Sequence, residues 1–255
     1  MSTATSVMAD FTHAAVESVP DENGFTHVAG YTSGTDNIQW TASDWSKYAD
    51  KILVRIEQGY GTSTPVLSSY DVLDVETGAW TPSTAAAEVK RRVEAGYQWT
   101  TLYGSEGTLE SCATLIKAMG DSVWVGHVDC VLANWNLDQA QAAAIVGTQV
   151  AGMTCRAVQW ASPTSNPKTL LPGTELTLTQ VNADLNAVQK TWRPAESVPR
   201  ETTPAPAPAP VPAPTPVVAE PVLQFNHAGV VVWLDDAGKL YSREVTSTDL
   251  GTTWK

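Results

Sequence analysis

The sequence predicts an α/β protein whose main domain contains a parallel β-sheet with crossover helices. Strand-like and helix-like segments alternate along most of the 255 residues, an order typical of parallel sheets that are either open or closed into a barrel. A Pro- and Ala-rich stretch interrupts this pattern, and a β-rich segment follows it. Hydrophobic residues make up 43% of the chain and charged residues 16%, which is enough apolar material for a packed core.

The expected elements follow from local patterns. Apolar and β-branched runs favour strands. Thr81 followed by Pro82 favours a helix start, because threonine caps the helix and proline fits its first turn. The strands are expected at residues 27–31, 51–58, 72–76, 99–103, 123–128 and 154–160. The helices are expected at residues 83–95, 108–119, 137–145 and 181–192.

Composition divides the chain into four regions. Residues 1–24 are expected to be an N-terminal extension, and residues 25–198 the α/β domain. Residues 199–221 alternate Pro and Ala, which favours polyproline II and predicts either a strut or a passive linker. Residues 222–255 contain two β-rich runs around the turn at 235–238, so a small β-hairpin module is expected. Such a hairpin is marginal alone, so it is expected to dock on a partner, self-associate or pack on the main domain.

The charge balance excludes some partners. There are 15 basic and 27 acidic residues, a net charge of −12, which argues against nucleic acid and anionic membranes as partners. Three cysteines without CxxC spacing predict neither a disulfide framework nor a zinc site. No signal peptide or long apolar run is visible, so synthesis in a cytoplasm without an export signal of its own is expected.

No motif predicts a metal or another cofactor. His127 and Asp129 supply only two potential ligands at an expected strand end, fewer than a metal site normally needs. The sequence contains no Gly-rich phosphate loop and no GxSxG motif.

Two acids, Asp74 and Glu76, are the best candidates for chemistry. Side chains alternate along a strand, so both point to the same side, at the carboxyl end of an expected parallel strand. Active sites of β/α barrels are built at that end. One carboxyl group of such a pair can stay charged while the other donates a proton. The alternative is that both are ordinary surface acids.

The segment Asp71-Val72-Leu73-Asp74-Val75-Glu76 and its surroundings resemble glycoside hydrolase family 25 lysozymes and the related glycoside-hydrolase-like domains of actinobacterial phages. In both, a DxE strand precedes a helix and a strand ending near Tyr-Gly or Tyr-Ser. The segments Val123–Gly126, Ala133–Trp135, Ala157–Trp160 and Asp184–Asn186 resemble later elements of the family. The resemblance runs loosely from His27 to Trp192.

The resemblance implies a shortened (β/α) barrel of TIM type that cleaves the glycan strands of peptidoglycan. Glu76 would be the general acid, Asp74 would stabilise the positive charge on the sugar, and Asp184 would line the same cleft. The family also carries an acid at the end of its first strand. Here Thr32 or Ser33 is expected at that place, which puts full activity in doubt.

Aromatic residues at or near expected strand ends are candidates for sugar binding, although an ordinary place in the core is the more common role for any one of them. They are Tyr31, Tyr103, Trp124, Trp135 and Trp160.

The sequence therefore favours a bacteriophage virion structural protein, a minor tail protein whose barrel binds cell-wall carbohydrate or serves as a structural module. Its expected partners are cell-wall glycan and, through the C-terminal module, other virion tail proteins in an oligomeric assembly. Its expected location is the phage tail. The alternatives are an active peptidoglycan muramidase and a host carbohydrate-binding protein.

Overall fold

The computed structural model describes residues 4–21, 24–59, 64–76 and 78–197, together with three short strands between residues 224 and 244. The chain divides into two compact units, Met1–Glu201 and Thr202–Lys255. None of the described helices has both the length and the apolar character needed to cross a membrane.

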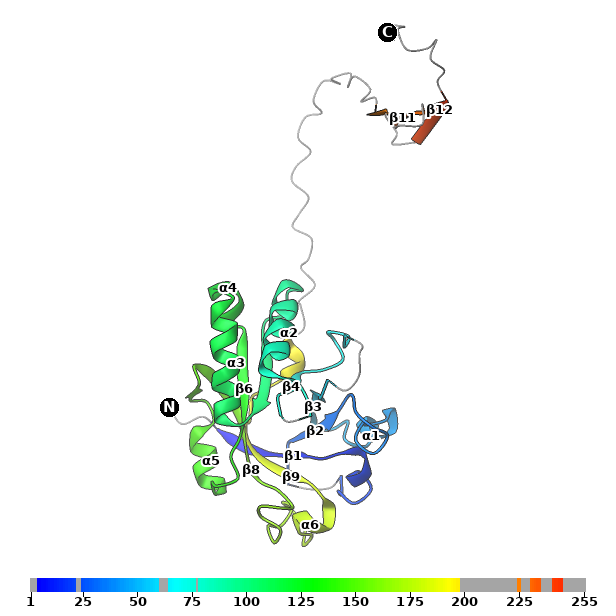
Figure 1. Ribbon diagram of the computed structural model, residues 1–255. Helices are drawn as coiled ribbons and strands as arrows, with labels where there is room; N and C mark the ends of the chain where they lie inside the picture. Colours follow the sequence, from blue (N-terminus) through cyan, green and yellow to red (C-terminus); the bar gives the residue numbers. More distant parts are fainter. Residues whose placement is uncertain are drawn as a thin grey trace, which may run out of the picture. The chain divides into compact units, whose positions relative to one another are not determined.

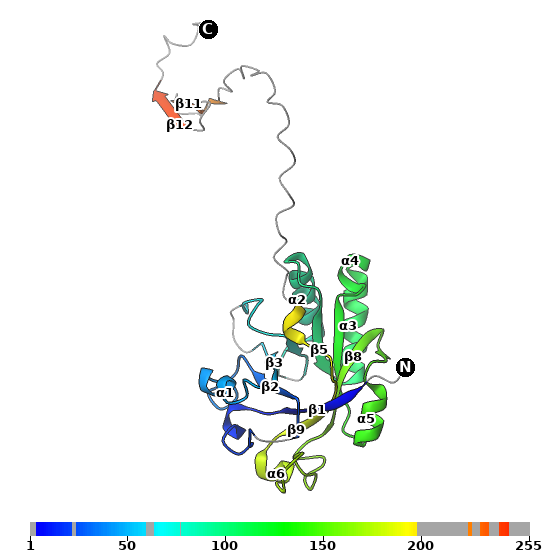
Figure 2. The same cartoon turned by 180° about the vertical axis from the view of Figure 1, so that it is seen from behind.

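The first unit is a closed, eight-stranded mixed β-barrel (Figures 1 and 2). Its strands are β1 (Thr5–Asp10), β2 (His27–Tyr31), β3 (Ile52–Glu57), β4 (Val72–Asp74), β5 (Thr100–Gly104), β6 (Val128–Ala133), β8 (Met153–Ala161) and β9 (Asp184–Gln189). Neighbouring strands from β1 to β6 run parallel, and β6 pairs with β8 to close the barrel. The short β7 (Gln149–Val150) pairs only with β8.

Strand β9 runs antiparallel to both of its neighbours, β1 and β8. Its first residue therefore lies at the end of the barrel where the parallel strands finish. The register shows this directly, because Asp184 at the start of β9 lies opposite Asp10 at the end of β1.

The helices are α1 (Ala42–Lys47), α2 (Pro82–Glu94), α3 (Glu106–Ala118), α4 (Asp121–Trp124), α5 (Gln139–Ile145) and α6 (Leu178–Val181). Helix α2 begins as its sequence predicts, because the Thr81 side chain accepts a hydrogen bond from the backbone N–H of Thr84 and Pro82 occupies the first turn. Helices α2 and α3 lie side by side on the outside of the barrel (Figures 1 and 2).

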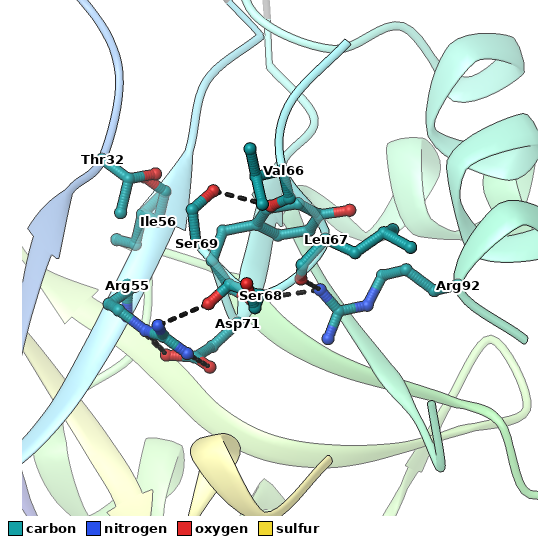
Figure 3. Close-up of polar contacts among 10 residues, drawn as sticks. Thr32, Arg55, Ile56, Val66, Leu67, Ser68, Ser69, Asp71 and Arg92 are labelled. Atoms are coloured by element: carbon teal, nitrogen blue, oxygen red, sulfur yellow. Dashed lines mark hydrogen bonds and ion pairs between the residues drawn. The ribbon is translucent and has the colours of Figure 1, made fainter. Parts of the chain in front are cut away.

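The connection between β3 and β4 has no helix among its described residues, and arginine side chains hold its second half instead (Figure 3). Arg55 forms hydrogen bonds with both carboxylate oxygens of Asp71, at 3.0 and 2.8 Å, and donates to the carbonyl of Ser68 at 2.7 Å. Arg92 donates to the carbonyls of Leu67 and Tyr70 at 2.9 and 3.0 Å. These contacts fix the chain just before β4, the strand that carries Asp74.

Two apolar clusters fill the unit, one on each side of the barrel wall. The outer cluster packs the helices against the strands and includes Leu73, Leu102 and Trp160. The inner cluster takes residues from all eight barrel strands. Its members are Met8, Ala29, Val54, Ile56, Val72, Tyr103, Val131, Ala133, Ala157 and Val188, with Trp192 beyond β9.

The barrel begins earlier than residue 25, where the sequence analysis starts it. Strand β1 pairs with β2 and β9, so residues 5–10 are part of the barrel wall and not of an extension. The only apolar run in this strand is Val7-Met8-Ala9. Met8 and Ala9 are both buried because the closed barrel covers both faces of the strand.

Two expected elements differ in the structure. Residues 121–124 form helix α4, and the strand expected at 123–128 begins only at Val128. The helix expected at 181–192 is strand β9. The apolar spacing of that segment fits a helix as well as a strand buried on both faces. Pairing with β1 and β8 decides the outcome, and Asn182, with φ of 51°, ends the short helix α6 just before the strand.

The second unit contains β10 (Gln224–Phe225), β11 (Val230–Leu234) and β12 (Leu240–Glu244), which pair antiparallel in that order. The expected β-hairpin corresponds to β11 and β12. The turn expected at 235–238 and the linker at 199–221 lie outside the described residues.

Candidate functional site

Strand alternation builds the candidate site at the carboxyl end of the barrel. Met8, Val72 and Ala157 belong to the inner cluster, and the residue two positions further along a strand points to the same side. The inward residues at the ends of these strands are therefore Asp10, Asp74 and Gln159. Asp184 joins them because it lies opposite Asp10 in the register.

Glu76 follows β4 by two residues and completes a group of four acids with Asp10, Asp74 and Asp184. The first two of these partners are only 4% exposed, whereas the side chain of Glu76 reaches solvent at the mouth of the barrel. The charges of Glu76, Asp74 and Asp184 all act on Asp10. The four carboxyl groups thus form one electrostatic unit.

Burial raises the pKa of every acid in this group, and repulsion by neighbouring acids raises the pKa of Asp10, Asp74 and Asp184 further. Burial, followed by the charge of Glu76, raises the pKa of Asp74 and that of Asp184 from 3.8 to about 7. The pKa of Asp10 rises well above its usual value through burial and then through Asp184, Asp74 and Glu76. Crowding by protein atoms raises the pKa of Glu76, while a hydrogen bond from Tyr103 acts in the opposite direction. Protons are therefore held in this group near neutral pH.

A cavity of about 430 Å³ opens beside these acids. Asp10, Tyr31 and Asp184 line it together with Trp135, which is 42% exposed. One oxygen of Asp10, Oδ1, is buried without a hydrogen-bond partner among the described residues. The cavity thus combines an acidic wall with an accessible aromatic ring, features suited to a polar ligand such as a sugar.

A line of hydrogen bonds crosses the barrel interior. The Tyr103 hydroxyl donates to Gln159 Oε1 at 2.5 Å, and Gln159 Nε2 donates to Asp184 Oδ2 at 3.0 Å. Gln159 is 1% exposed, so water does not compete for its amide. On the other side, Gln58 Nε2 donates to Asp74 Oδ2 at 3.1 Å.

The expectation that the first barrel strand lacks an acid is wrong, because that strand is β1 and it ends with Asp10. Thr32 and Ser33, which follow β2, have another role. Both hydroxyls donate to the buried carboxylate of Glu57, Thr32 at 3.0 Å. They fix the loop after β3 and do not replace a missing acid.

The structure brings together six of the eight site residues expected from the sequence. Asp74, Glu76, Asp184, Tyr31, Tyr103 and Trp135 lie at the carboxyl end of the barrel or at the cavity. That Tyr31, Tyr103 and Trp135 bind substrate stays a prediction.

Trp124 and Trp160 lie elsewhere. Trp124 is on α4, at the end of the barrel where the parallel strands begin: Lys117 Nζ lies 4.5 Å from its ring centroid, and a side chain at Gly152, before β8, would meet the ring at 3.2 Å. Trp160 follows Gln159 by one residue, so it packs in the outer cluster. Gln159, one residue earlier on the same strand, points inward and lies at the carboxyl end of the barrel.

The sequence patterns do not single out Asp10 or Gln58, and they include Gln159 only as part of the segment Ala157–Trp160. A signal for Asp10 exists in Val7-Met8-Ala9-Asp10, a short apolar run that ends in an acid, as the run before Asp74 does. No sequence signal separates Gln58 from other loop glutamines.

Among the described residues, no three His, Cys, Asp or Glu side chains are grouped in a way that could hold a metal ion. What the acids can do is donate and accept protons, because they combine buried and exposed carboxyl groups with raised pKa values.

No protein-family model matches the sequence, and no curated protein is significantly similar to it.

Proposed function

We propose that the barrel is a glycoside hydrolase of the family 25 lysozyme type, a shortened (β/α) barrel that cleaves glycosidic bonds in peptidoglycan. The observation that carries the proposal is the group of four carboxyl groups, Asp10, Asp74, Glu76 and Asp184, at the carboxyl ends of the strands. The sequence resemblance supplies the substrate class.

Glu76 is the general acid in this proposal. It reaches the mouth of the barrel, where it can protonate the glycosidic oxygen as the bond to the anomeric carbon breaks. An ionised Asp74 stabilises the positive charge that develops on the sugar. Water then adds to the anomeric carbon, and its released proton returns to the carboxylate of Glu76.

The proposal requires one proton on the pair formed by Asp74 and Glu76. Both pKa values are raised, that of Asp74 to about 7. The pair therefore loses its last proton as pH rises through about 7, and glycan release is expected to fall above that pH. A rate that stays constant from pH 6 to pH 9 would contradict the proposal.

The test is release of new reducing ends from purified peptidoglycan, with wild type compared with Glu76→Gln. The substitution keeps the size of the side chain and removes its proton, so the rate is expected to fall by at least about 100-fold. Glu110→Gln, on the exposed face of α3, is the matched control and is expected to retain full activity. Equal rates for wild type and Glu76→Gln would refute the proposal.

We also propose that this protein is a minor tail protein of a bacteriophage virion. The support is the Pro- and Ala-rich stretch followed by a β module too small to be stable by itself. A hydrolase carried on a particle is delivered directly to the cell wall. Immunoelectron microscopy of particles with an antibody against the barrel tests this, and unlabelled tails would contradict it.

A further inference from the structure

The cavity beside the acids has an anionic wall and no cationic side chain among its described lining. Asp10 and Asp184 line it from paired positions at the ends of β1 and β9. None of the described residues that line it is Lys, Arg or His. Elsewhere in the unit a buried acid finds a basic partner, as Asp71 does in Arg55 at 2.8 Å. The cavity wall thus leaves the place of a counter-charge open to a ligand.

One oxygen of this wall also lacks a hydrogen-bond donor. Asp10 is 4% exposed, and its Oδ1 has no partner among the described residues. A buried acceptor without a donor is unfavourable for the folded protein. Because Asp10 also lines the cavity, a ligand bound there can supply the donor. The wall therefore favours a ligand that brings both a positive charge and N–H groups.

An ammonium group fits this wall better than a metal ion does. Among the residues that the structure describes, no three His, Cys, Asp or Glu side chains are grouped so that they could hold a metal. An ammonium group needs no such shell of ligands, because it carries three N–H donors of its own. Hydrogen bonds between an ammonium and a carboxylate are also stronger than those between neutral groups.

Other groups at the cavity suit a sugar ring. Trp135 lines the cavity and is 42% exposed, so its indole ring is accessible for stacking. Ser162, Thr164 and Ser165 line it as well and carry hydroxyl groups that can donate and accept. The backbone N–H of Ser165 donates to Ser162 Oγ at 3.0 Å, which fixes this segment locally.

We propose that the cavity is a subsite for a sugar with a free amino group, such as a glucosamine unit in an N-deacetylated glycan strand. The ammonium group binds the carboxyl groups of Asp10 and Asp184, and the sugar ring packs on Trp135. An N-acetyl group at the same place is neutral, and a carboxylate on the sugar is repelled by the same acids. The proposal deepens the proposed function by naming the form of glycan, and it rests on that function for the identity of the polymer.

The experiment compares the binding of two ligands to the full chain by isothermal titration calorimetry at pH 6. The ligands are the β-1,4-linked tetramer of glucosamine and its fully N-acetylated form. At this pH an amine of ordinary pKa is charged, and the bound cation favours the ionised form of the acids. The glucosamine tetramer is expected to bind at least about tenfold more tightly than the acetylated tetramer. Sodium chloride at about 0.5 M is expected to reduce this preference by screening.

Two substitutions each remove one charge from the wall. Asp10→Asn and Asp184→Asn keep the size of the side chain and are each expected to reduce the preference to less than about threefold. Asp184→Asn remains informative if Asp10→Asn does not fold, because it removes an acid whose charged form is opposed by burial and by Glu76. Glu110→Gln, on the exposed face of α3, is the matched control and is expected to keep the full preference.

A third substitution separates stacking from charge. Trp135→Ala is expected to weaken the binding of both tetramers by a similar factor, because the aromatic ring is available to either sugar. The preference for the glucosamine tetramer is expected to stay unchanged. Weaker binding of the glucosamine tetramer alone would overturn the placement of the sugar ring on Trp135.

Three results would overturn the amino-sugar subsite. The first is equal affinity of the wild type for the two tetramers. The second is a preference that is unchanged in both Asp10→Asn and Asp184→Asn. The third is binding of tetralysine as tightly as the glucosamine tetramer, because the sugar would then contribute nothing; tetralysine is expected to bind at least about tenfold more weakly.

None of these measurements depends on cleavage, so the two proposals fail separately. A protein that prefers the glucosamine tetramer but releases no reducing ends from peptidoglycan refutes the proposed function and keeps the subsite. A protein that releases reducing ends and binds both tetramers equally keeps the proposed function and refutes the subsite.

Discussion

Acids at the carboxyl end of the barrel and acids elsewhere in the same unit have different partners. Asp71 is bound by Arg55 at two oxygens, and Asp129 by Arg156 at 2.8 Å. Asp44 accepts hydrogen bonds from the backbone and hydroxyl of Thr41. At the carboxyl end, by contrast, acids face other acids, and no described basic side chain contributes to the shifts of Asp74 or Asp184.

The comparison separates structural acids from candidate catalytic acids. For Asp44, burial would raise the pKa, but hydrogen bonds from Thr41 and His13 outweigh burial and lower it. For Asp74 and Asp184, burial and the nearby charge of Glu76 act in the same direction. The folded state therefore favours the charged form of Asp44 and disfavours the charged forms of Asp74 and Asp184.

The largest effect on stability is expected where an acid with a cationic partner is removed. Asp71→Asn leaves the Arg55 guanidinium without its counter-charge at the start of β4. We predict a loss of about 3 kcal/mol in the free energy of unfolding at pH 7. Urea unfolding measures it. A loss below about 0.5 kcal/mol would show that the ion pair does not hold this loop.

Asp184→Asn is expected to increase the free energy of unfolding, whereas Asp71→Asn decreases it. A raised pKa means that the folded state binds more protons than the unfolded state, so the charged acid costs stability as pH rises from about 4 to about 7. We predict that Asp184→Asn adds about 2 kcal/mol to the free energy of unfolding at pH 8 and almost nothing at pH 4. Urea unfolding at both values measures this. A destabilised variant at pH 8 would contradict the electrostatic account.

The smallest effect is expected at the rim of the cavity. Trp135 is accessible and lines the cavity without belonging to the acid group. We predict that Trp135→Ala raises the KM for glycan strands about tenfold, the equivalent of about 1.4 kcal/mol, and leaves kcat within a factor of two. A fall in kcat alone would place Trp135 in a different role.

The sequence predicts the elements whose signals are local. The capped start of α2, the apolar run of β3 and the acids at the end of β4 are all visible in short windows. The elements β1 and β9 are not, because each is a strand only through its neighbours in the closed barrel. Their pairing brings Asp10 and Asp184 together. Local patterns therefore do not show that these two acids meet, and Asp184 is singled out only by the family resemblance.

The aromatic residues show a different limit. Successive side chains of a strand point to opposite faces. A correctly predicted strand therefore does not show whether Gln159 or Trp160 points into the barrel when the sequence does not reveal which face is inside. Both are hardly exposed. Their packing distinguishes them, because Ala157, two residues before Gln159, lies in the inner cluster and Trp160 lies in the outer one.

The most direct test of the central claim is a carbon-13 titration of the aspartate carboxyl groups, with Asp74→Asn, Asp184→Asn and Asp44→Asn used for assignment. The account predicts that Asp74 and Asp184 titrate at about pH 7, and that Asp44 titrates below 3.8. Titration of both Asp74 and Asp184 below pH 5 would contradict the claim that the carboxyl end of the barrel holds a proton-sharing group of acids.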